Sequence, residues 1–318
     1  MPHDIHSIAY TGAQPWHGLG NKLALNAPLE EWAHSAGMDW RICESPVSYQ
    51  VEAAGQLGVY HGQKVLYRSD TQKALSIVSD NYHIVQPGEV LEFFRELVEV
   101  RGYVLDAAGC LRGGRRFWAL AKMGELIDLP GGDLVEGYLL LATSCDGTIA
   151  TSVIPTSIRV VCSNTLHATL QGAVGGIRVV HSRAFDAVKA KAKLDLAREQ
   201  WDAYAQLIQR LTRKRISKAE ATRYFQTVVA DMQAHDSGNV QRKHAKSYDA
   251  MNRLYGGSAK GASLKSAEGT AWGLLNAVTE YVDHGRKTRS EDSRLTSAWF
   301  GRGAFLKQWA LEQAEALL

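Results

Sequence analysis

The sequence predicts an α+β fold, in which an antiparallel β-sheet packed with helices is followed by an all-α region. Three observations carry this prediction. Two apolar runs flank Asp146-Gly147, apolar and polar residues alternate along 115–123, and helical periodicity replaces strand patterns after the glycine-rich stretch 172–176. We therefore expect an α+β core domain over residues 1–180 and a basic helical region over residues 181–318.

Composition and charge narrow the class of protein. The 318 residues are 45% hydrophobic and 22% charged, as in ordinary globular chains. No apolar run approaches the roughly 20 residues of a membrane helix, and the first ten residues lack a signal-peptide pattern, so we expect a cytoplasmic protein without membrane contact. The four cysteines have no CxxC spacing, which indicates small buried side chains and neither a zinc site nor a disulfide framework.

The net charge of +3 conceals an asymmetry between the two parts of the chain. Residues 181–318 contain 23 Lys and Arg against 15 Asp and Glu, whereas residues 1–180 contain 13 against 18. A basic region favours a polyanionic partner such as nucleic acid. A solvated Lys/Arg face on helices gives the same composition, so both interpretations stay open.

The first hundred residues predict a helix, a β-meander and a second helix. A short helix is expected from Pro28 or Leu29 to Ser35, with Gly37 just beyond its end. Short extended runs separated by glycine and Ser-Asp turns predict a meander over residues 40–85. The segment EVLEFFRELVEV that follows has apolar residues at helical spacing and predicts an amphipathic helix.

A hairpin with a basic bend is expected next. Residues 103–108 and 115–123 flank the bend CLRGG, and alternation in the second arm places Arg116, Trp118 and Lys122 on one face. Basic and aromatic side chains interleaved on a strand suit single-stranded nucleic acid, because cations neutralise phosphates while rings stack on bases. The alternative is structural: Trp118 fills the core, and the long basic side chains lie at the rim of the sheet.

The apolar runs around Asp146-Gly147 predict the central hairpin of the fold. Asp-Gly is typical of a type I′ turn, in which both turn residues have positive φ. If Cys145 faces Thr148, one core face is formed by alternate residues of both strands. The residues on that face are Tyr138, Leu140, Ala142, Ile149, Thr151 and Val153.

The segment after Pro155 predicts an extended run from 158 to 162, followed by a short helix capped by Ser163 or Asn164. Arg159 lies alone among apolar residues of this run. It is either a core-edge arginine paired with a carboxylate or an arginine that contacts phosphate from a sheet.

The region beyond residue 180 predicts five helices. One of them begins with a capping box formed by Ser217 and Glu220. The expected ranges are 182–215, 217–233, 242–255, 266–284 and a last helix that runs toward residue 318.

Catalytic signatures are missing from the sequence. It contains no GxxxxGK[ST], GxGxxG after a strand, HExxH or GxSxG motif. Isolated ionisable residues such as His83, His167 and Asp146 have no partner at a spacing that specifies a reaction. We therefore expect a protein that is not an enzyme and requires no metal or nucleotide cofactor.

Five segments of the chain carry a family resemblance. They are AYTGAQPWHGLG, SIVSDNYHIVQPGE, RVVCSNTL, GTAWGLLNAVTEYVDH and SAWFGRGAFLKQWAL. In this order they resemble the phage/plasmid-like protein family, a domain of unknown function found on phages, plasmids and integrated elements. The layout of its central α+β part is similar to the cores of single-strand annealing proteins of recombination, which is a topological analogy.

These observations together predict a single-stranded DNA-binding and annealing protein of a mobile genetic element. It would pair strands without bond chemistry, on a basic groove of a homo-oligomer that forms a ring or a filament. The alternatives are a protein-binding module of a mobile element, such as an inhibitor of host defence with a host or element-encoded partner, and a metal-dependent nuclease whose carboxylates the sequence does not identify. The residues expected to contact DNA are Tyr82, Arg112, Arg115, Arg116, Trp118, Lys122 and Arg159.

Overall fold

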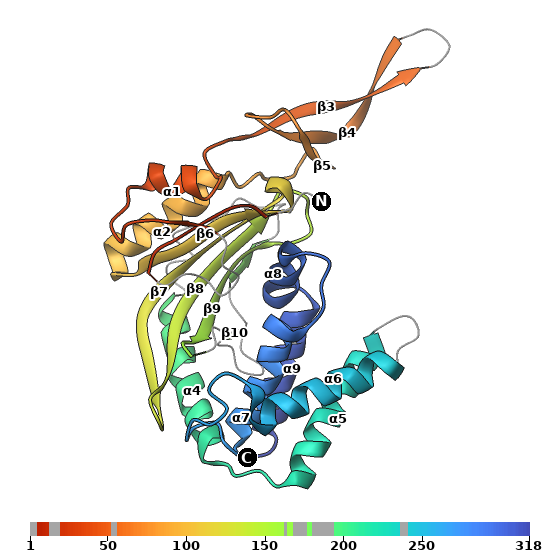
Figure 1. Cartoon of the computed structure of the whole chain (residues 1–318). Helices are drawn as coiled ribbons and strands as arrows, with labels where there is room; N and C mark the ends of the chain where they lie inside the picture. The colour runs from red at the N-terminus through yellow and green to blue at the C-terminus, as the bar shows by residue number, and fades with distance from the viewer. Residues whose placement is uncertain are drawn as a thin grey trace. The chain divides into compact units, whose positions relative to one another are not determined.

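The chain is α+β (Figure 1). It forms two compact units, each assembled from three stretches of sequence. The computed structural model describes residues 5–12, 20–51, 56–161, 164–167, 177–179, 194–235 and 241–318. Unit 1 consists of Met1–Met123, Leu139–Ile154 and Gly176–Asp195. Unit 2 consists of Gly124–Tyr138, Pro155–Gly175 and Leu196–Leu318.

The larger sheet has eight strands in the order β10-β9-β8-β7-β6-β1-β2, and β11 also pairs with β9. The strand β2 is parallel to β1, while β6 is antiparallel to both β1 and β7. Strands β7, β8 and β9 each contribute residues to both units. The strand bounds are β1 Ile5–Tyr10, β2 Asn21–Lys22, β6 Val104–Leu111, β7 Arg116–Leu129, β8 Asp133–Ser144, β9 Thr151–Arg159, β10 Asn164–His167 and β11 Ile177–Val179.

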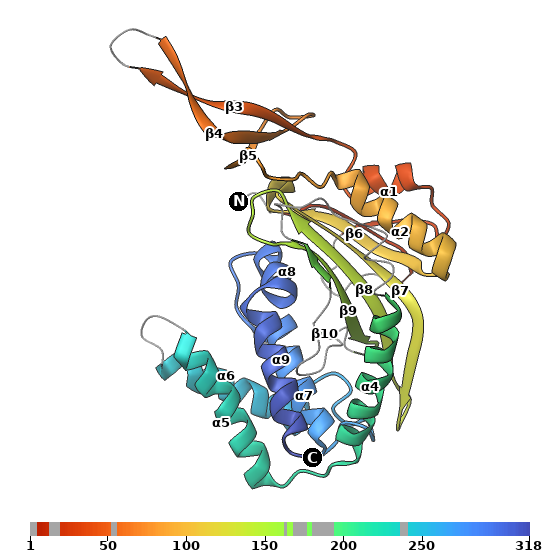
Figure 2. The ribbon, with the colours of Figure 1, turned by 180° about the vertical axis from the view of Figure 1, so that it is seen from behind.

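The predicted β-meander is confirmed as a second, three-stranded sheet in the order β3-β4-β5. Its strands are β3 Ile42–Val51, β4 Gln56–Arg68 and β5 Ala74–Ser79. The helices predicted on either side of it are also present, as α1 Leu29–Ser35 and α2 Pro87–Arg101. These two helices pack together, and α2 also packs on β6 (Figure 2).

The central hairpin forms, but its turn and register differ from the prediction. Strands β8 and β9 are neighbours in the sheet, and the connection between them runs from Cys145 to Ala150. The carboxylate of Asp146 accepts hydrogen bonds from the backbone N–H of Thr148 at 3.0 Å and from its hydroxyl at 2.5 Å. Gly147 has a φ of 70° whereas Asp146 is not in the positive-φ region, so this side-chain turn replaces the type I′ turn.

The register of β8 and β9 is read from two threonines. The hydroxyls of Thr143 and Thr151 are 2.8 Å apart, so these side chains share a face of the sheet. The prediction placed Thr151 with Ala142 instead. A one-residue difference moves every side chain of a strand to the other face, and the longer connection removes the constraint that a two-residue turn would impose.

The short helix predicted after Ser163 is wrong. Residues Asn164–His167 form β10, which pairs with β9 through Asn164↔Arg159 and His167↔Thr156. Leu166 is buried and Ser157 donates its hydroxyl to the carbonyl of Leu166, so tertiary pairing determines the local conformation here.

The C-terminal region is helical, as predicted. Its helices are α4 Leu194–Arg213, α5 Lys218–His235, α6 Gln241–Arg253, α7 Ala271–Glu280, α8 Glu291–Phe300 and α9 Arg302–Glu315, with π-helical turns η2 Leu254–Ser258 and η3 Tyr281–Gly285. The predicted helix over 182–215 is described only from residue 194 onward. No helix in the described ranges has the length and apolar character needed to cross a membrane.

Helix ends follow local capping, and this corrects two predicted boundaries. The capping box is confirmed, since Ser217 N–H donates to Glu220 at 2.8 Å and Glu220 N–H donates to the Ser217 hydroxyl at 3.2 Å. The helix predicted from Ser266 begins at Ala271 because Thr270 accepts from the N–H of Gly273 at 3.1 Å. The predicted final helix is two helices, because the backbone of Gly301 is extended between them.

Candidate nucleic-acid interface

The bend between β6 and β7 carries the exposed arginines of the predicted site. We call Arg112–Arg116 the arginine turn; it begins with the 3-10 turn η1 Arg112–Gly114. Arg112, Gly113 and Gly114 have φ values of 53°, 66° and 95°. A Cβ on Gly114 would lie 2.6 Å from the ring of Trp40, so only glycine fits there. Arg112 and Arg115 are exposed at the surface of unit 1.

Arg116, the last residue of the turn, is buried and supports the β8–β9 connection. Its guanidinium donates to the hydroxyl of Thr148 from Nε at 3.2 Å and from Nη2 at 2.9 Å. That hydroxyl in turn donates to Asp146. The predicted phosphate contact of Arg116 is therefore corrected: the side chain holds a neighbouring loop, because β7 enters the interior of the sheet at this residue.

Two further residues of unit 1, Arg115 and Tyr82, hydrogen-bond to this connection and to the end of β8. Cys145 N–H donates to the carbonyl of Arg115 at 2.9 Å, and the half-buried Tyr82 donates its hydroxyl to the carbonyl of Ser144 at 2.7 Å. Burial, reinforced by Cys145, raises the pKa of Tyr82 above its ordinary value. The phenol therefore stays protonated at neutral pH and keeps its donor role. The structure thus brings Tyr82 and the arginine turn to one loop, although they are distant in sequence.

Trp118 and Lys122 lie further along β7 and do not form a stacking platform. Trp118 is 2% exposed, and its neighbour Phe117 on the opposite face is buried as well. The first part of β7 is buried on both faces, and β6 and β8 pair with its two edges, so β7 is an interior strand of the sheet. Lys122 is partly exposed, with its Nζ 3.9 Å from Asp106. The prediction that Trp118 stacks on bases is corrected, since its ring belongs to the core.

Arg159 belongs to unit 2 and is a core arginine. Its Nε and Nη2 donate to the two carboxylate oxygens of Asp133 at 2.7 and 2.8 Å. Ser266 and Trp272 donate to the same carboxylate at 2.6 and 3.0 Å, and Arg159 also donates to the carbonyl of Gly261 at 3.1 Å. The carboxylate-paired alternative for this residue is the one that the structure contains, and the predicted phosphate contact is corrected.

A further arginine, which the sequence did not single out, supports the arginine turn. The Arg68 guanidinium lies 4.0 Å from the centre of the Trp40 ring and donates to Gly113 O at 3.4 Å. It also donates twice to the carboxylate of Asp70, at 2.9 and 2.6 Å, and this pairing lowers the pKa of Asp70 to about 2. The contact between Arg68 and Gly113 joins residues that are 45 positions apart in the sequence, so no local sequence pattern indicates it.

Two exposed cationic residues, Arg41 and Lys73, are hydrogen-bonded through their backbone carbonyls to Ser69 and Arg68. The N–H of Arg68 donates to the carbonyl of Lys73 at 3.0 Å, and the N–H of Ser69 donates to the carbonyl of Arg41 at 2.9 Å. Both Arg41 and Lys73 are exposed. Exposed cations of unit 1 therefore lie on three segments that are linked to one another through Arg68 and Ser69.

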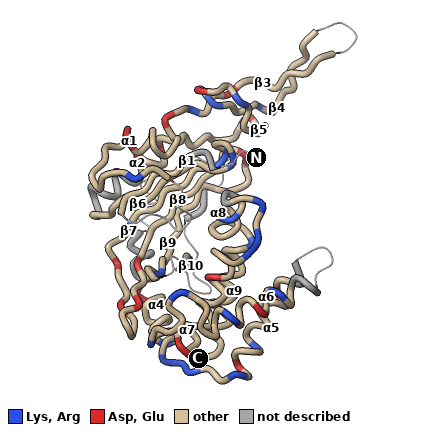
Figure 3. The backbone as a smooth tube through the Cα atoms, viewed as in Figure 1, with Lys and Arg blue, Asp and Glu red and all other residues tan. Residues whose placement is uncertain are grey.

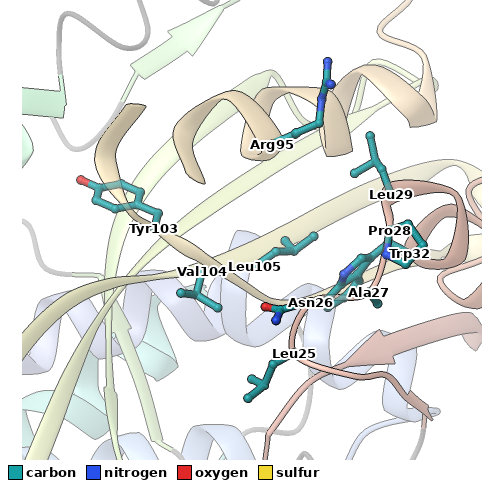
Figure 4. A pocket seen from close by; sticks show the side chains of 10 residues that line it. All are labelled: Leu25, Asn26, Ala27, Pro28, Leu29, Trp32, Arg95, Tyr103, Val104 and Leu105. Atoms are coloured by element: carbon teal, nitrogen blue, oxygen red, sulfur yellow. The ribbon is translucent and has the colours of Figure 1, made fainter. Parts of the chain in front are cut away.

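An apolar groove lies at the opposite end of β6. Its volume is about 330 Å³, and it has Trp32 and Leu105 as buried walls and the exposed side chains of Leu25 and Val104 at its border (Figure 4). Since β6 rises about 3.3 Å per residue, the groove and the arginine turn lie more than 20 Å apart. The lining residues are Leu25, Asn26, Ala27, Pro28, Leu29, Trp32, Arg95, Tyr103, Val104 and Leu105.

Metal-binding and disulfide chemistry find no support in the part of the chain that the structure describes. No group of three His, Cys, Asp or Glu side chains there is arranged to hold a metal ion. Cys43, Cys110 and Cys145 are free thiols, and burial raises the pKa of Cys145 to about 12. Cys162 lies outside the described residues.

Comparison with known proteins identifies a family and no named relative. Residues 74–299 match the family model for the Domain of unknown function (DUF932). The match begins at the start of β5 and ends in α8, so it includes the arginine turn and the network around Asp133. A search of curated proteins and a search of solved structures each found no match. Since the family model covers well over half of its residues, the chain belongs to the DUF932 family, a domain of unknown function.

Proposed function

We propose that this protein binds single-stranded DNA at the arginine turn and promotes its pairing with a complementary strand, without breaking or forming covalent bonds. The observation that carries the proposal is the exposure of Arg112 and Arg115 on a bend that the surrounding structure holds in place. Guanidinium groups bind phosphate oxygens through charge-assisted, often bidentate hydrogen bonds. Contacts of this kind leave the base edges free to pair.

The arginine turn is supported on three sides within unit 1. Trp40 packs against Gly114, Arg68 donates to the carbonyl of Gly113, and the carbonyl of Arg115 accepts from Cys145. A ligand that binds a pre-organised turn orders little additional backbone. The backbone positions of Arg112 and Arg115 are thus fixed before DNA arrives.

The nearby charges favour an anionic ligand. Arg41 and Lys73 are further exposed cations, and their backbone carbonyls accept from the N–H groups of Ser69 and Arg68. Two acidic residues nearby are engaged by internal donors, since Asp70 pairs with Arg68 and Asp146 accepts from Thr148. The positive charge of Arg68 reduces the repulsion that Asp70 would exert on a phosphate backbone, whereas the groups of Thr148 are neutral and leave the charge of Asp146 in place.

The proposal also includes an oligomeric state and a role in a mobile genetic element. One turn with a few cations covers only a few nucleotides, so the alignment of two strands needs several subunits, and we propose a homo-oligomer in the form of a ring or filament. The resemblance to the phage/plasmid-like protein family supports a role in recombination of a mobile element. No cofactor enters this mechanism.

The test is the salt dependence of binding to a labelled oligo(dT) strand, measured by fluorescence anisotropy. Removal of two phosphate contacts in Arg112→Ala/Arg115→Ala should reduce the slope of log K against log salt by about 1.4, since each contact to a single strand contributes about 0.7. The matched control Lys218→Ala/Arg223→Ala removes two exposed positive charges from α5 and should retain the wild-type slope.

Both variants should melt at the wild-type temperature, because all four side chains are exposed. A folded Arg112→Ala/Arg115→Ala protein with unchanged affinity would reject this site. Absence of wild-type binding at about 50 mM salt, where electrostatic contacts are strong, would reject the function itself.

The second candidate, a protein-binding module such as an inhibitor of host defence, is favoured by a different observation. The outer parts of β3 and β4 expose apolar side chains such as Leu57 and Tyr60. An uncharged protein contact would depend weakly on salt, whereas DNA binding would depend on it steeply.

A further inference from the structure

The β3–β4 hairpin extends beyond the third strand of its sheet. We call residues Val47–Val51 of β3 and Gln56–Tyr60 of β4 the outer ribbon; they pair from Val47↔Tyr60 to Val51↔Gln56. The pairs recorded for β5 involve only residues from Gln63 to Tyr67 of β4. In both views of the molecule β3 and β4 therefore project past β5, and among the described strands the ribbon has no third neighbour (Figures 1 and 2).

A bulge separates the outer ribbon from the base of the sheet. Pro46 pairs with Lys64 and Val47 pairs with Tyr60, so the β4 residues between Tyr60 and Lys64 have no counterpart on β3. Gly62 within the bulge has a φ of 88°, which a glycine adopts without strain. The base is charged, since Lys64 pairs with Glu44 at 2.7 Å.

The outer ribbon exposes large apolar side chains on both of its faces. Five of them are between 40% and 75% exposed, and strand alternation places Tyr49, Val51 and Tyr60 on one face and Leu57 and Val59 on the other. The ring of Tyr49 covers Gly58, where a Cβ would lie 2.5 Å from it. A two-stranded ribbon of this kind is marginally stable in water unless something covers it.

The outer ribbon is also uncharged. Within Val47–Val51 and Gln56–Tyr60 there is no Asp, Glu, Lys or Arg, and Figure 3 shows this part of the hairpin free of blue and red. DNA is an unsuitable occupant, because phosphates require cations. A second copy of the same ribbon is suitable: a two-fold contact brings each residue near its own equivalent, and an uncharged surface avoids like-charge repulsion there.

We propose that the β4 edge of the outer ribbon pairs antiparallel with the β4 edge of a second copy, giving the strand order β3-β4-β4-β3 across a two-fold axis. This edge continues the line on which β5 already pairs with β4, so backbone donors and acceptors there are available to a new strand. With the axis at Gly58, Leu57 of one copy faces Val59 of the other, on the same face. The proposal deepens the homo-oligomer of the proposed function, and it rests on the ribbon alone.

The test uses opposite charges at the proposed contact, with mass measured by analytical ultracentrifugation over a range of concentrations. Wild type should be a dimer or a larger assembly built from dimers. The variants Leu57→Lys/Val59→Lys and Leu57→Glu/Val59→Glu should each raise the dimer Kd by roughly 100-fold or more, because like charges meet across the axis. An equimolar mixture of the two variants should restore association, because opposite charges then face each other.

The matched control is Leu25→Lys, which adds a charge to an exposed apolar side chain at the border of the groove and should leave association unchanged. If this control dissociates the protein and the mixed variants stay monomeric, the ribbon binds the groove of another copy and the two-fold pairing is wrong. A wild type that remains monomeric at all concentrations would overturn the proposal in favour of a foreign protein partner.

The ribbon and the arginine turn are tested separately. Arg112→Ala/Arg115→Ala should keep the wild-type mass, so a loss of DNA binding in a protein that still associates refutes nothing about the ribbon. The lysine and glutamate variants should remain folded, with the circular dichroism spectrum of wild type, because the substituted side chains are exposed in the single subunit. Their melting temperature should be lower than that of wild type only by the stability that dimer formation adds. Failure of self-association alone leaves DNA binding by the single subunit to be measured.

Discussion

Arg159 donates to both carboxylate oxygens of Asp133, and both side chains are almost entirely buried in unit 2. The carboxylate is shared by Ser266 and Trp272, which lie more than a hundred residues further along the chain. Removal of any one partner of a buried ion pair strongly lowers the stability of the fold, because the charge that remains is buried without compensation. The network therefore joins the start of β8, the end of β9 and the segment that leads into α7.

The ion pair predicts a large effect for a substitution that changes charge and retains shape. Asp133→Asn should destabilise the protein by about 3–5 kcal/mol, because it leaves the buried Arg159 guanidinium uncompensated. Urea unfolding at pH 7 measures the effect. Glu92→Gln, which breaks the exposed pair with Arg95, should change stability by no more than about 0.5 kcal/mol. Equal effects of the two substitutions would contradict the structural role of Asp133.

In the first turn of α7, replacement of a glycine by alanine should lower stability, although the same replacement usually stabilises a helix. Ala is a better helix former than Gly by up to about 1 kcal/mol, yet a Cβ on Gly273 would overlap the carbonyl oxygen of Ala267. Gly273→Ala should therefore destabilise by about 1–3 kcal/mol, as overpacking does. Gly88→Ala in α2, where a Cβ meets nothing within 4 Å, should be neutral or stabilising. Thermal melts of both variants make the comparison, and a stabilised Gly273→Ala protein would disprove the steric argument.

The N-cap of α7 predicts that two substitutions of Thr270 differ in their effect on stability. Thr270 accepts from the N–H of Gly273, and its hydroxyl donates toward the carbonyls of Ser266 and Ala267 at 2.7 and 3.0 Å. Thr270→Ala should cost about 1 kcal/mol, because a buried helix donor loses its acceptor. Thr270→Ser retains the hydroxyl and should lose clearly less. Denaturant midpoints with unchanged m-values would establish the difference, and similar losses in both variants would argue against the cap.

His167 predicts an acid-sensitive term in stability. Burial, reinforced by the positive charge of Lys307, lowers the pKa of His167 to about 4, against about 6.5 in an unfolded chain. Between these values the unfolded chain binds a proton that the folded protein does not, so stability falls as the pH falls. From pH 7 to pH 5 the loss should be about 2 kcal/mol.

The variant His167→Gln isolates this term, because it removes the imidazole and leaves the other ionisable groups in place. Its unfolding free energy, measured at the same two pH values, should fall less than that of wild type. An identical fall in both proteins would show that His167 does not carry the pH dependence.

Elements with strong local signals were predictable from sequence. The helical spacing of residues in α2 and the reciprocal pair Ser217 and Glu220 define a helix and a helix start without tertiary information. The β8–β9 register was not predictable in the same way. Asp146-Gly147 is compatible with several turns, and the choice depends on Thr148, whose hydroxyl also binds Arg116 from another strand.

The candidate site was predictable only where it depends on a bend. The glycines next to Arg112 and Arg115 marked an exposed turn, and the structure has one there. The alternation around Trp118 did not distinguish an edge strand from an interior strand, and only the sheet order shows that β7 is interior. Arg159 was likewise undecided, because its partner Asp133 is distant in sequence.

The interleaving of the two units also bears on how the chain is synthesised. Once Asp195 has left the ribosome every stretch of unit 1 exists, whereas unit 2 consists only of Gly124–Tyr138 and Pro155–Gly175. Those two stretches include apolar residues such as Leu129 and Val135, which are buried in the finished protein. These residues stay exposed to solvent until Leu196–Leu318, the last stretch of unit 2, has been synthesised. A nascent chain that stalls near Asp195 would therefore contain all of unit 1 together with exposed apolar strand segments of unit 2. Such a chain is the form most prone to binding by chaperones or to aggregation.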